Sequence, residues 1–73
     1  MAAEIIPHPP STNIAQITFD KDTQTLTIQF VKGGVIQFYE VPEDAALGFG
    51  QALSATKYMN AYIENQYPQQ RVG

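Results

Sequence analysis

The chain has 73 residues, a formal net charge of −3 and no cysteine, so it holds one small domain that disulfides cannot stabilise. Its residues are 44% hydrophobic and 15% charged, which is the composition of a globular domain and excludes disorder over the whole chain. A single histidine excludes a structural zinc site, and no apolar run reaches the roughly 18 residues that a membrane helix needs. We expect a cytoplasmic monomer that binds no cofactor, metal or membrane.

The first twelve residues are rich in proline. Three prolines at positions 7–10 fix the backbone φ angle, lack a hydrogen-bond donor and push their predecessors toward extended geometry. We therefore predict a flexible arm over residues 1–12. Ile5 and Ile6 lie in this arm, and two interpretations stay open: they cover a patch of the domain's own surface, or they form a hook for a partner.

Three antiparallel strands are predicted after the arm. The first begins near Asn13 and runs to the turn-forming residues 20–24. In the second, residues 25–30, a period of two places the apolar side chains against a core and the polar ones in water. The apolar set is Leu26, Ile28 and Phe30, and the polar set is Thr25, Thr27 and Gln29. Residues 32–34 supply the positive φ angles of a tight hairpin. The third strand, residues 35–41, is apolar on both faces, which predicts either a central strand or one covered on both sides.

A first helix is predicted to begin at Pro42, because proline suits the first helical position. Glu43 and Asp44 follow, where the helix dipole favours carboxylates; a basic protein partner would also be attracted to them. An apolar stripe continues at three- and four-residue spacing. The stripe is Ala46, Leu47, Gly50 and Leu53. We expect Gly48 and Gly50 to make this helix short or bent and to let it approach the sheet closely.

A second helix is predicted after Ser54, and proline's restriction on its predecessor stops it before Pro68. Its apolar stripe is Tyr58, Met59, Tyr62, Ile63 and Gln66. The predicted fold is α+β: a three-stranded antiparallel meander followed by two helices packed on one face, over residues 13–68. Residues 69–73 are expected to form a tail.

The chain lacks the side chains that enzymatic chemistry usually needs. It has no cysteine nucleophile, and its one histidine, His8, lies between prolines in the predicted arm. We therefore expect a protein that is not an enzyme. Asp20 and Asp22 resemble the first two ligands of a calcium loop, but the later acidic ligands and the glycine of that pattern are absent, so a plain hairpin turn is the better interpretation.

Tyrosines in and after the second helix allow two interpretations. Tyr58, Tyr62 and Tyr67 have the spacing of core packing, and they would also suit stacking on unpaired bases. Lys57 and Arg71 flank them and would support nucleic-acid binding. The single carboxylate of Glu64 between them opposes it, because a groove that follows a phosphate backbone needs positive potential throughout.

The order of motifs resembles the KTSC family, a small domain that occurs alone in bacteria and phages and at the C-terminus of some lysyl-tRNA synthetases. The overlap runs from about Ser11 to Val72. It rests on Ser11-Thr12-Asn13-Ile14, Ile17-Thr18-Phe19-Asp20, Leu26, Phe30, Gly34-Val35, Val41-Pro42, Leu47, Ala52-Leu53-Ser54, Lys57-Tyr58-Met59-Asn60, Ile63, Tyr67-Pro68 and Arg71-Val72. Two motifs differ: Ile36-Gln37-Phe38 replaces the family's Tyr-x-Tyr pair, and Glu64 replaces an arginine.

This resemblance implies a non-catalytic adaptor that works near RNA or its machinery. A free-standing acidic version is similar to small bacteriophage regulators that bind host RNA polymerase and inhibit initiation or alter termination. The alternative it implies is an RNA-binding module of the translation and tRNA machinery. We expect the partner to bind the exposed faces of the two helices, with Tyr67 and Arg71 at the rim. The candidate partner-binding residues are Glu43, Asp44, Lys57, Tyr58, Asn60, Tyr67 and Arg71.

Overall fold

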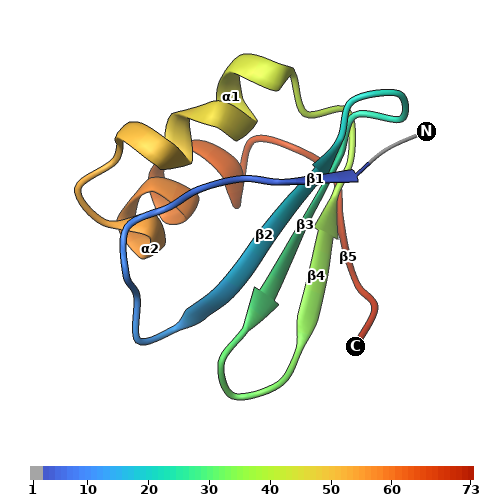
Figure 1. Ribbon diagram of the computed structural model, residues 1–73. Coiled ribbons are helices and arrows are strands. Elements are labelled where there is room, and N and C mark those ends of the chain that lie inside the picture. The colour runs from blue at the N-terminus through green and yellow to red at the C-terminus, as the bar shows by residue number, and fades with distance from the viewer. Residues whose placement is uncertain (1–2) are drawn as a thin grey trace.

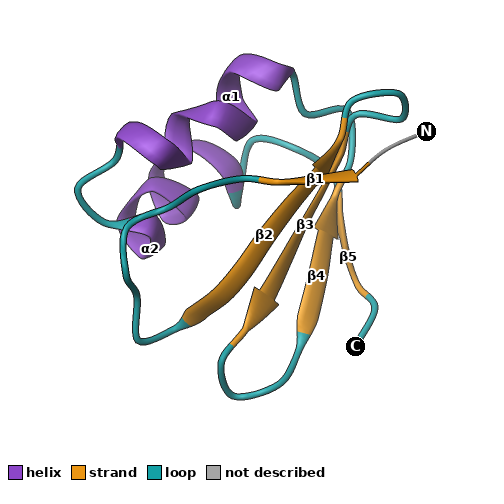
Figure 2. Ribbon diagram, viewed as in Figure 1, coloured by secondary structure: helices purple, strands orange, loops and turns teal. Residues whose placement is uncertain are grey.

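The computed structural model describes residues 3–73 and consists of a five-stranded antiparallel sheet with all helical segments on one face (Figure 1 and Figure 2). The strands are β1 (Ala3–Ile5), β2 (Ile14–Asp20), β3 (Thr25–Phe30), β4 (Val35–Phe38) and β5 (Gln69–Arg71), and they lie in the sheet in that order. The helical segments are α1 (Glu43–Leu47), the 3₁₀ turn η1 (Gly48–Gln51), α2 (Ala55–Tyr58) and the π turn η2 (Met59–Ile63). The predicted α+β class is confirmed.

The sheet has two more strands than the predicted meander, and the first of them lies in the expected arm. β1 pairs with β2, the Ile6 N–H donates to the Ile17 carbonyl oxygen at 2.8 Å, and the Ile6 side chain is only 1% exposed. The prolines begin at Pro7, so residues 3–6 are free to pair as a strand. The expectation of a free arm is wrong for these residues, while residues 1–2 lie outside those the structure describes.

The second additional strand lies in the expected tail. β5 pairs antiparallel with β4, with Gln70 opposite Gln37, and the Tyr39 N–H donates to the Pro68 carbonyl oxygen at 2.9 Å. The side chains of β5 are polar and exposed. Main-chain pairing therefore holds this strand, and a hydrophobic pattern could not have revealed it.

The sheet is covered on one face only. Its inner face and the helical segments enclose the core, whose buried side chains are Ile6, Ile14, Ile17, Phe19, Leu26, Ile28, Phe38, Val41, Ala46, Phe49, Ala55, Met59 and Ile63. On the opposite face, Val35 and Gln37 stay half-buried without a second layer. Of the two predictions for the third strand, the central position is correct, because β4 lies between β3 and β5, and no helical segment among residues 3–73 covers its second face.

The predicted third strand also ends early, because the chain turns sharply at Glu40. Glu40 has a φ of 59° and Gln24 a φ of 56°, both in the left-handed region. The Val41 N–H donates to the Gln24 carbonyl oxygen at 3.0 Å, which joins this turn to the β2–β3 turn. The turn carries Val41 into the core. Pro42 is the N-cap of α1, whereas the prediction made it the first residue of the helix.

Candidate partner-binding surface on the helical segments

An apolar groove of about 510 Å³ lies on the helical segments. Its lining residues are Ala52, Leu53, Ser54, Lys57, Tyr58, Ala61 and Tyr62. We call this surface the helical groove. Leu53 is fully exposed and the Tyr62 side chain is 60% exposed. Exposed apolar side chains that gather around one groove, unlike scattered ones, mark interaction sites.

The extended link between η1 and α2 places Leu53 in solvent. Ala52 and Ser54 both have extended backbone angles, with ψ of 148° and 122°. Ser54 then caps α2, because its hydroxyl oxygen accepts a hydrogen bond from the Lys57 N–H at 3.3 Å. The link is therefore fixed at its downstream end by the cap, and Leu53 projects from it next to the groove.

Leu53 and Leu47 lie outside the core, although the predicted stripe placed both inside. Leu47 is the last residue of α1, and the 3₁₀ turn that follows ends at Gln51. Leu53 therefore lies in the extended link, where an α-helical period does not apply. Phe49, which the stripe omitted, is fully buried instead. The core therefore contains Phe49 and neither leucine, and Leu53 lines the helical groove.

Tyr58 forms the fixed part of the groove. Its hydroxyl donates to the Ala45 carbonyl oxygen at 2.7 Å, and its ring packs edge-on against Phe49 with ring centroids 4.6 Å apart. The Tyr62 ring lies 5.0 Å from the Tyr58 ring at 41°. These contacts hold an aromatic surface in one orientation, which lowers the entropy cost of binding.

Gly48 and Gly50 lie close to α2 and to the segment after β1, and not to the sheet. A methyl group at Gly48 would overlap the Tyr58 hydroxyl, so only glycine admits that tyrosine. A Cβ atom at Gly50 would lie 3.4 Å from the Pro7 carbonyl oxygen. The prediction that these glycines let the helix approach the sheet is therefore wrong: the close neighbours are Tyr58 of α2 and Pro7, after β1.

The pKa of Tyr58 is raised above its ordinary value of 10.0, first by burial and then by the neighbouring phenols of Tyr67 and Tyr62. The hydroxyl therefore stays protonated at neutral pH and remains a hydrogen-bond donor to Ala45.

The predicted binding residues do not form one surface. Lys57 and Tyr58 line the helical groove, and Asn60 lies exposed in η2 outside its lining. Glu43 and Asp44 are exposed in the first turn of α1. All five of these residues lie on the helical segments, as expected.

Neither of the two expected rim residues is part of the lining of the helical groove. Tyr67 is half-buried and packs against the core. Arg71 lies in β5, where its Nε donates to the Gly73 carbonyl oxygen at 3.2 Å. β5 and α2 lie at opposite sides of the molecule in Figure 1. Arg71 is therefore not part of the rim of the helical groove.

The acidic turn between β2 and β3 is a hairpin turn, as preferred from the sequence. The Asp20 Oδ1 atom accepts a hydrogen bond from the Asp22 N–H at 3.0 Å. Among residues 3–73, no three His, Asp or Glu side chains lie close enough together to hold a metal ion. Within the same range, none of the helices has the length and apolar character required to cross a membrane.

Comparisons with known proteins agree with the resemblance read from the motifs. A crystal structure of a KTSC domain protein from Yersinia pestis matches with a TM-score of 0.86 and 29% identity, over 99% of this chain and 100% of that one. A lysine–tRNA ligase of Nostoc punctiforme is 30% identical over 59 residues, which cover 81% of this chain but only 10% of the ligase. The KTSC domain family itself matches residues 10–67, most of the chain. The chain therefore belongs to the KTSC domain family.

Proposed function

We propose that this chain is a monomeric, non-enzymatic binding module that uses the helical groove to bind bacterial RNA polymerase and thereby inhibits initiation or alters termination. The observation that carries the proposal is the full exposure of Leu53 beside the exposed Tyr62 ring. Tyrosine is enriched at the energetic centres of protein interfaces, and an exposed leucine gains free energy when a partner covers it.

The composition of the groove supports binding over catalysis. Its lining residues include no carboxylate and no imidazole that would activate a nucleophile. The Ser54 hydroxyl accepts the cap hydrogen bond of α2, and the raised pKa of Tyr58 keeps that hydroxyl protonated. Both hydroxyl groups therefore have structural tasks.

The choice of polymerase as partner rests on the similarity to small phage regulators and on the negative net charge. An acidic protein is drawn to basic protein surfaces and repelled by nucleic acid. A standard interface needs about 800 Å² from each partner, and the chain exposes 4612 Å². A domain of this size can therefore block a site on a larger enzyme without chemistry of its own.

Binding of the purified chain to bacterial RNA polymerase, measured by biolayer interferometry, tests the proposal. Leu53→Asp should weaken binding at least about tenfold, because it places a charge in the apolar contact. Val31→Asp, at an exposed valine in the β3–β4 turn, is the matched control and should leave the affinity unchanged. Failure of the unmodified chain to bind at low salt, or equal loss in both variants, would contradict the proposal.

The alternative is an RNA-binding module of the translation machinery, which the similarity to a lysine–tRNA ligase favours. It would use Lys57 and Tyr58 of α2, Tyr67 and, in β5, Arg71. Titration with single-stranded RNA at low ionic strength tests it. Affinity no tighter than the nonspecific range of about 10⁻⁴ to 10⁻⁶ M would contradict this alternative.

A further inference from the structure

The helical segments cover only one face of the sheet (Figure 2), and a row of register partners crosses all five strands on the other face. Each member of the row is the register partner of the next. The row is Ile5, Thr18, Thr27, Gln37 and Gln70. We call this uncovered surface the open face. Side chains that lie directly opposite on adjacent strands are close enough to interact.

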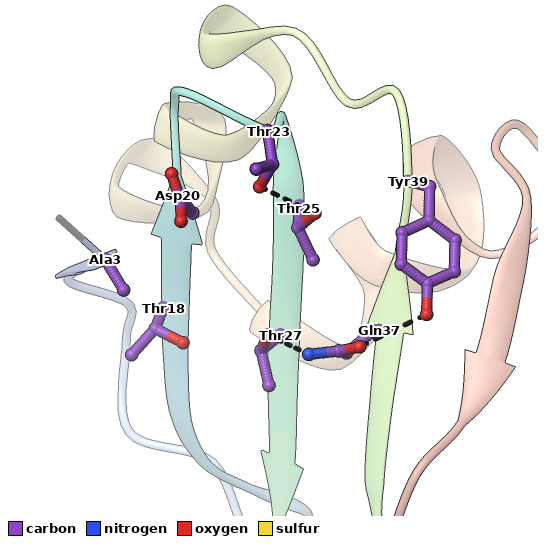
Figure 3. Close-up of a pocket in the computed structure, with 8 residues that line it drawn as sticks. All are labelled: Ala3, Thr18, Asp20, Thr23, Thr25, Thr27, Gln37 and Tyr39. Carbon is purple, nitrogen blue, oxygen red and sulfur yellow. Dashed lines mark hydrogen bonds between the residues drawn. The ribbon is translucent and has the colours of Figure 1, made fainter. Parts of the chain in front are cut away.

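Hydrogen bonds hold the polar part of this row in place. The Gln37 Nε2 atom donates to the Thr27 hydroxyl oxygen at 3.4 Å. The Tyr39 hydroxyl lies 3.1 Å from Gln37 Oε1 and 3.3 Å from Gln70 Oε1, so it donates to either amide. Figure 3 shows the Tyr39 hydroxyl directed at Gln37, which in turn points to Thr27. The polar groups are thus oriented before any ligand arrives.

A shallow pocket of about 310 Å³ lies over this network. Its lining residues are Ala3, Thr18, Asp20, Thr23, Thr25, Thr27, Gln37 and Tyr39. Among residues 3–73, the lining contains no basic side chain, and its single charge is the carboxylate of Asp20. A phosphate or carboxylate ligand would therefore meet no cation there, and the volume is at the lower end of small-ligand sites.

We infer that the open face binds a neutral saccharide in this pocket. Sugar hydroxyls both donate and accept hydrogen bonds, and so do the threonine hydroxyls and the Gln37 amide. The Asp20 carboxylate adds an acceptor, which forms the stronger charge-assisted hydrogen bonds. The Tyr39 ring lies beside these groups in Figure 3 and offers an apolar surface to the C–H face of a pyranose.

Other ligand classes fit this pocket less well. A peptide anchored by an apolar side chain would need large aliphatic residues, and the lining has none. Nucleic acid would need lysine or arginine for its phosphates. The saccharide site and the helical groove share no residue, so the inference does not depend on the proposed function.

Amide chemical shifts of the full chain, followed by NMR during addition of a sugar, test the inference. The probes are maltotriose, cellotriose, mannotriose and triacetylchitotriose, each at about 20 mM, which saturates a site with a Kd of about 1 mM. At least one probe should shift the amides of Thr27, Gln37 and Tyr39. Thr27→Val keeps the β-branched shape but removes one hydroxyl, and it should weaken binding about tenfold.

Gln29→Ala is the matched control, because Gln29 lies on the same face, beside the pocket but outside its lining, and should leave the affinity unchanged. Tyr39→Ala should abolish the shifts. Three results would overturn the inference: no shift with any of the four sugars, equal affinity in Thr27→Val, or shifts confined to the helical groove. Leu53→Asp should bind the sugar normally, which separates this test from that of the polymerase interaction.

Discussion

The Tyr58 hydroxyl reaches the Ala45 carbonyl oxygen at 2.7 Å through space that Gly48 leaves open. Gly48 has an ordinary helical φ of −60°, so the backbone there does not require glycine. The requirement comes from the tyrosine that packs on it. The bond joins α1 to α2 and fixes one wall of the helical groove.

Gly48→Ala should therefore destabilise the protein by about 1–3 kcal/mol, because the new methyl group displaces Tyr58 from its hydrogen bond. Gly50→Ala is the matched control: its Cβ atom would lie 3.4 Å from the Pro7 carbonyl oxygen, an ordinary contact. That change should be neutral or stabilise by up to about 1 kcal/mol through helix propensity. Urea unfolding measures both, and equal effects would contradict the role of Tyr58.

Ile6→Ala should cost about 2–5 kcal/mol, because it removes a buried side chain from the core. Ile6 is 1% exposed, whereas its neighbour Ile5 is 69% exposed. Ile5→Ala should therefore stay within about 0.5 kcal/mol of the parent. Thermal unfolding of the two variants measures whether the segment after β1 belongs to the fold. A melting temperature that stays unchanged in Ile6→Ala would show that it does not.

Phe49→Ala should cost about 3–5 kcal/mol, since its ring is fully buried. Leu53→Ala, four residues later, should leave stability unchanged because Leu53 loses no burial. Chemical denaturation distinguishes this arrangement from an α-helix continued to Leu53, in which residues 49 and 53 would share one face and both changes would be costly.

The raised pKa of Tyr58 predicts a pH dependence at the alkaline end. The folded state holds this proton more tightly than the unfolded state, so the contribution to stability is complete below the unfolded value near 10.0 and is lost as the pH rises through the folded value. Tyr58→Phe should flatten the loss of stability above pH 10.0. Unfolding curves at increasing pH measure the difference, and identical slopes would contradict the assignment.

Local patterns in the sequence were sufficient for the central part of the fold. The alternation around Leu26 and Ile28 predicted the buried face of β3, and Pro42 marked the start of α1 within one residue. β1 and β5 have no such pattern, because they are three-residue edge strands held by main-chain pairing.

The candidate site was predicted only in part. Lys57 and Tyr58 do line the groove, but Leu53 was assigned to the core. Leu53 faces solvent because the helix ends at Gln51 and the chain is extended at Ala52 and Ser54. The stripe itself contains no signal that the helix ends before Leu53, so a search for helical periodicity could not reveal it.

β3 is the middle strand, with two strands on either side. When β1 or β5 frays at the edge of the sheet, the amides of β3 stay hydrogen-bonded. Only unfolding of the whole domain therefore lets these amides exchange with deuterium. In hydrogen exchange, the amides of Leu26 and Ile28 should therefore report the global unfolding free energy, while those of β1 and β5 exchange through cheaper local openings.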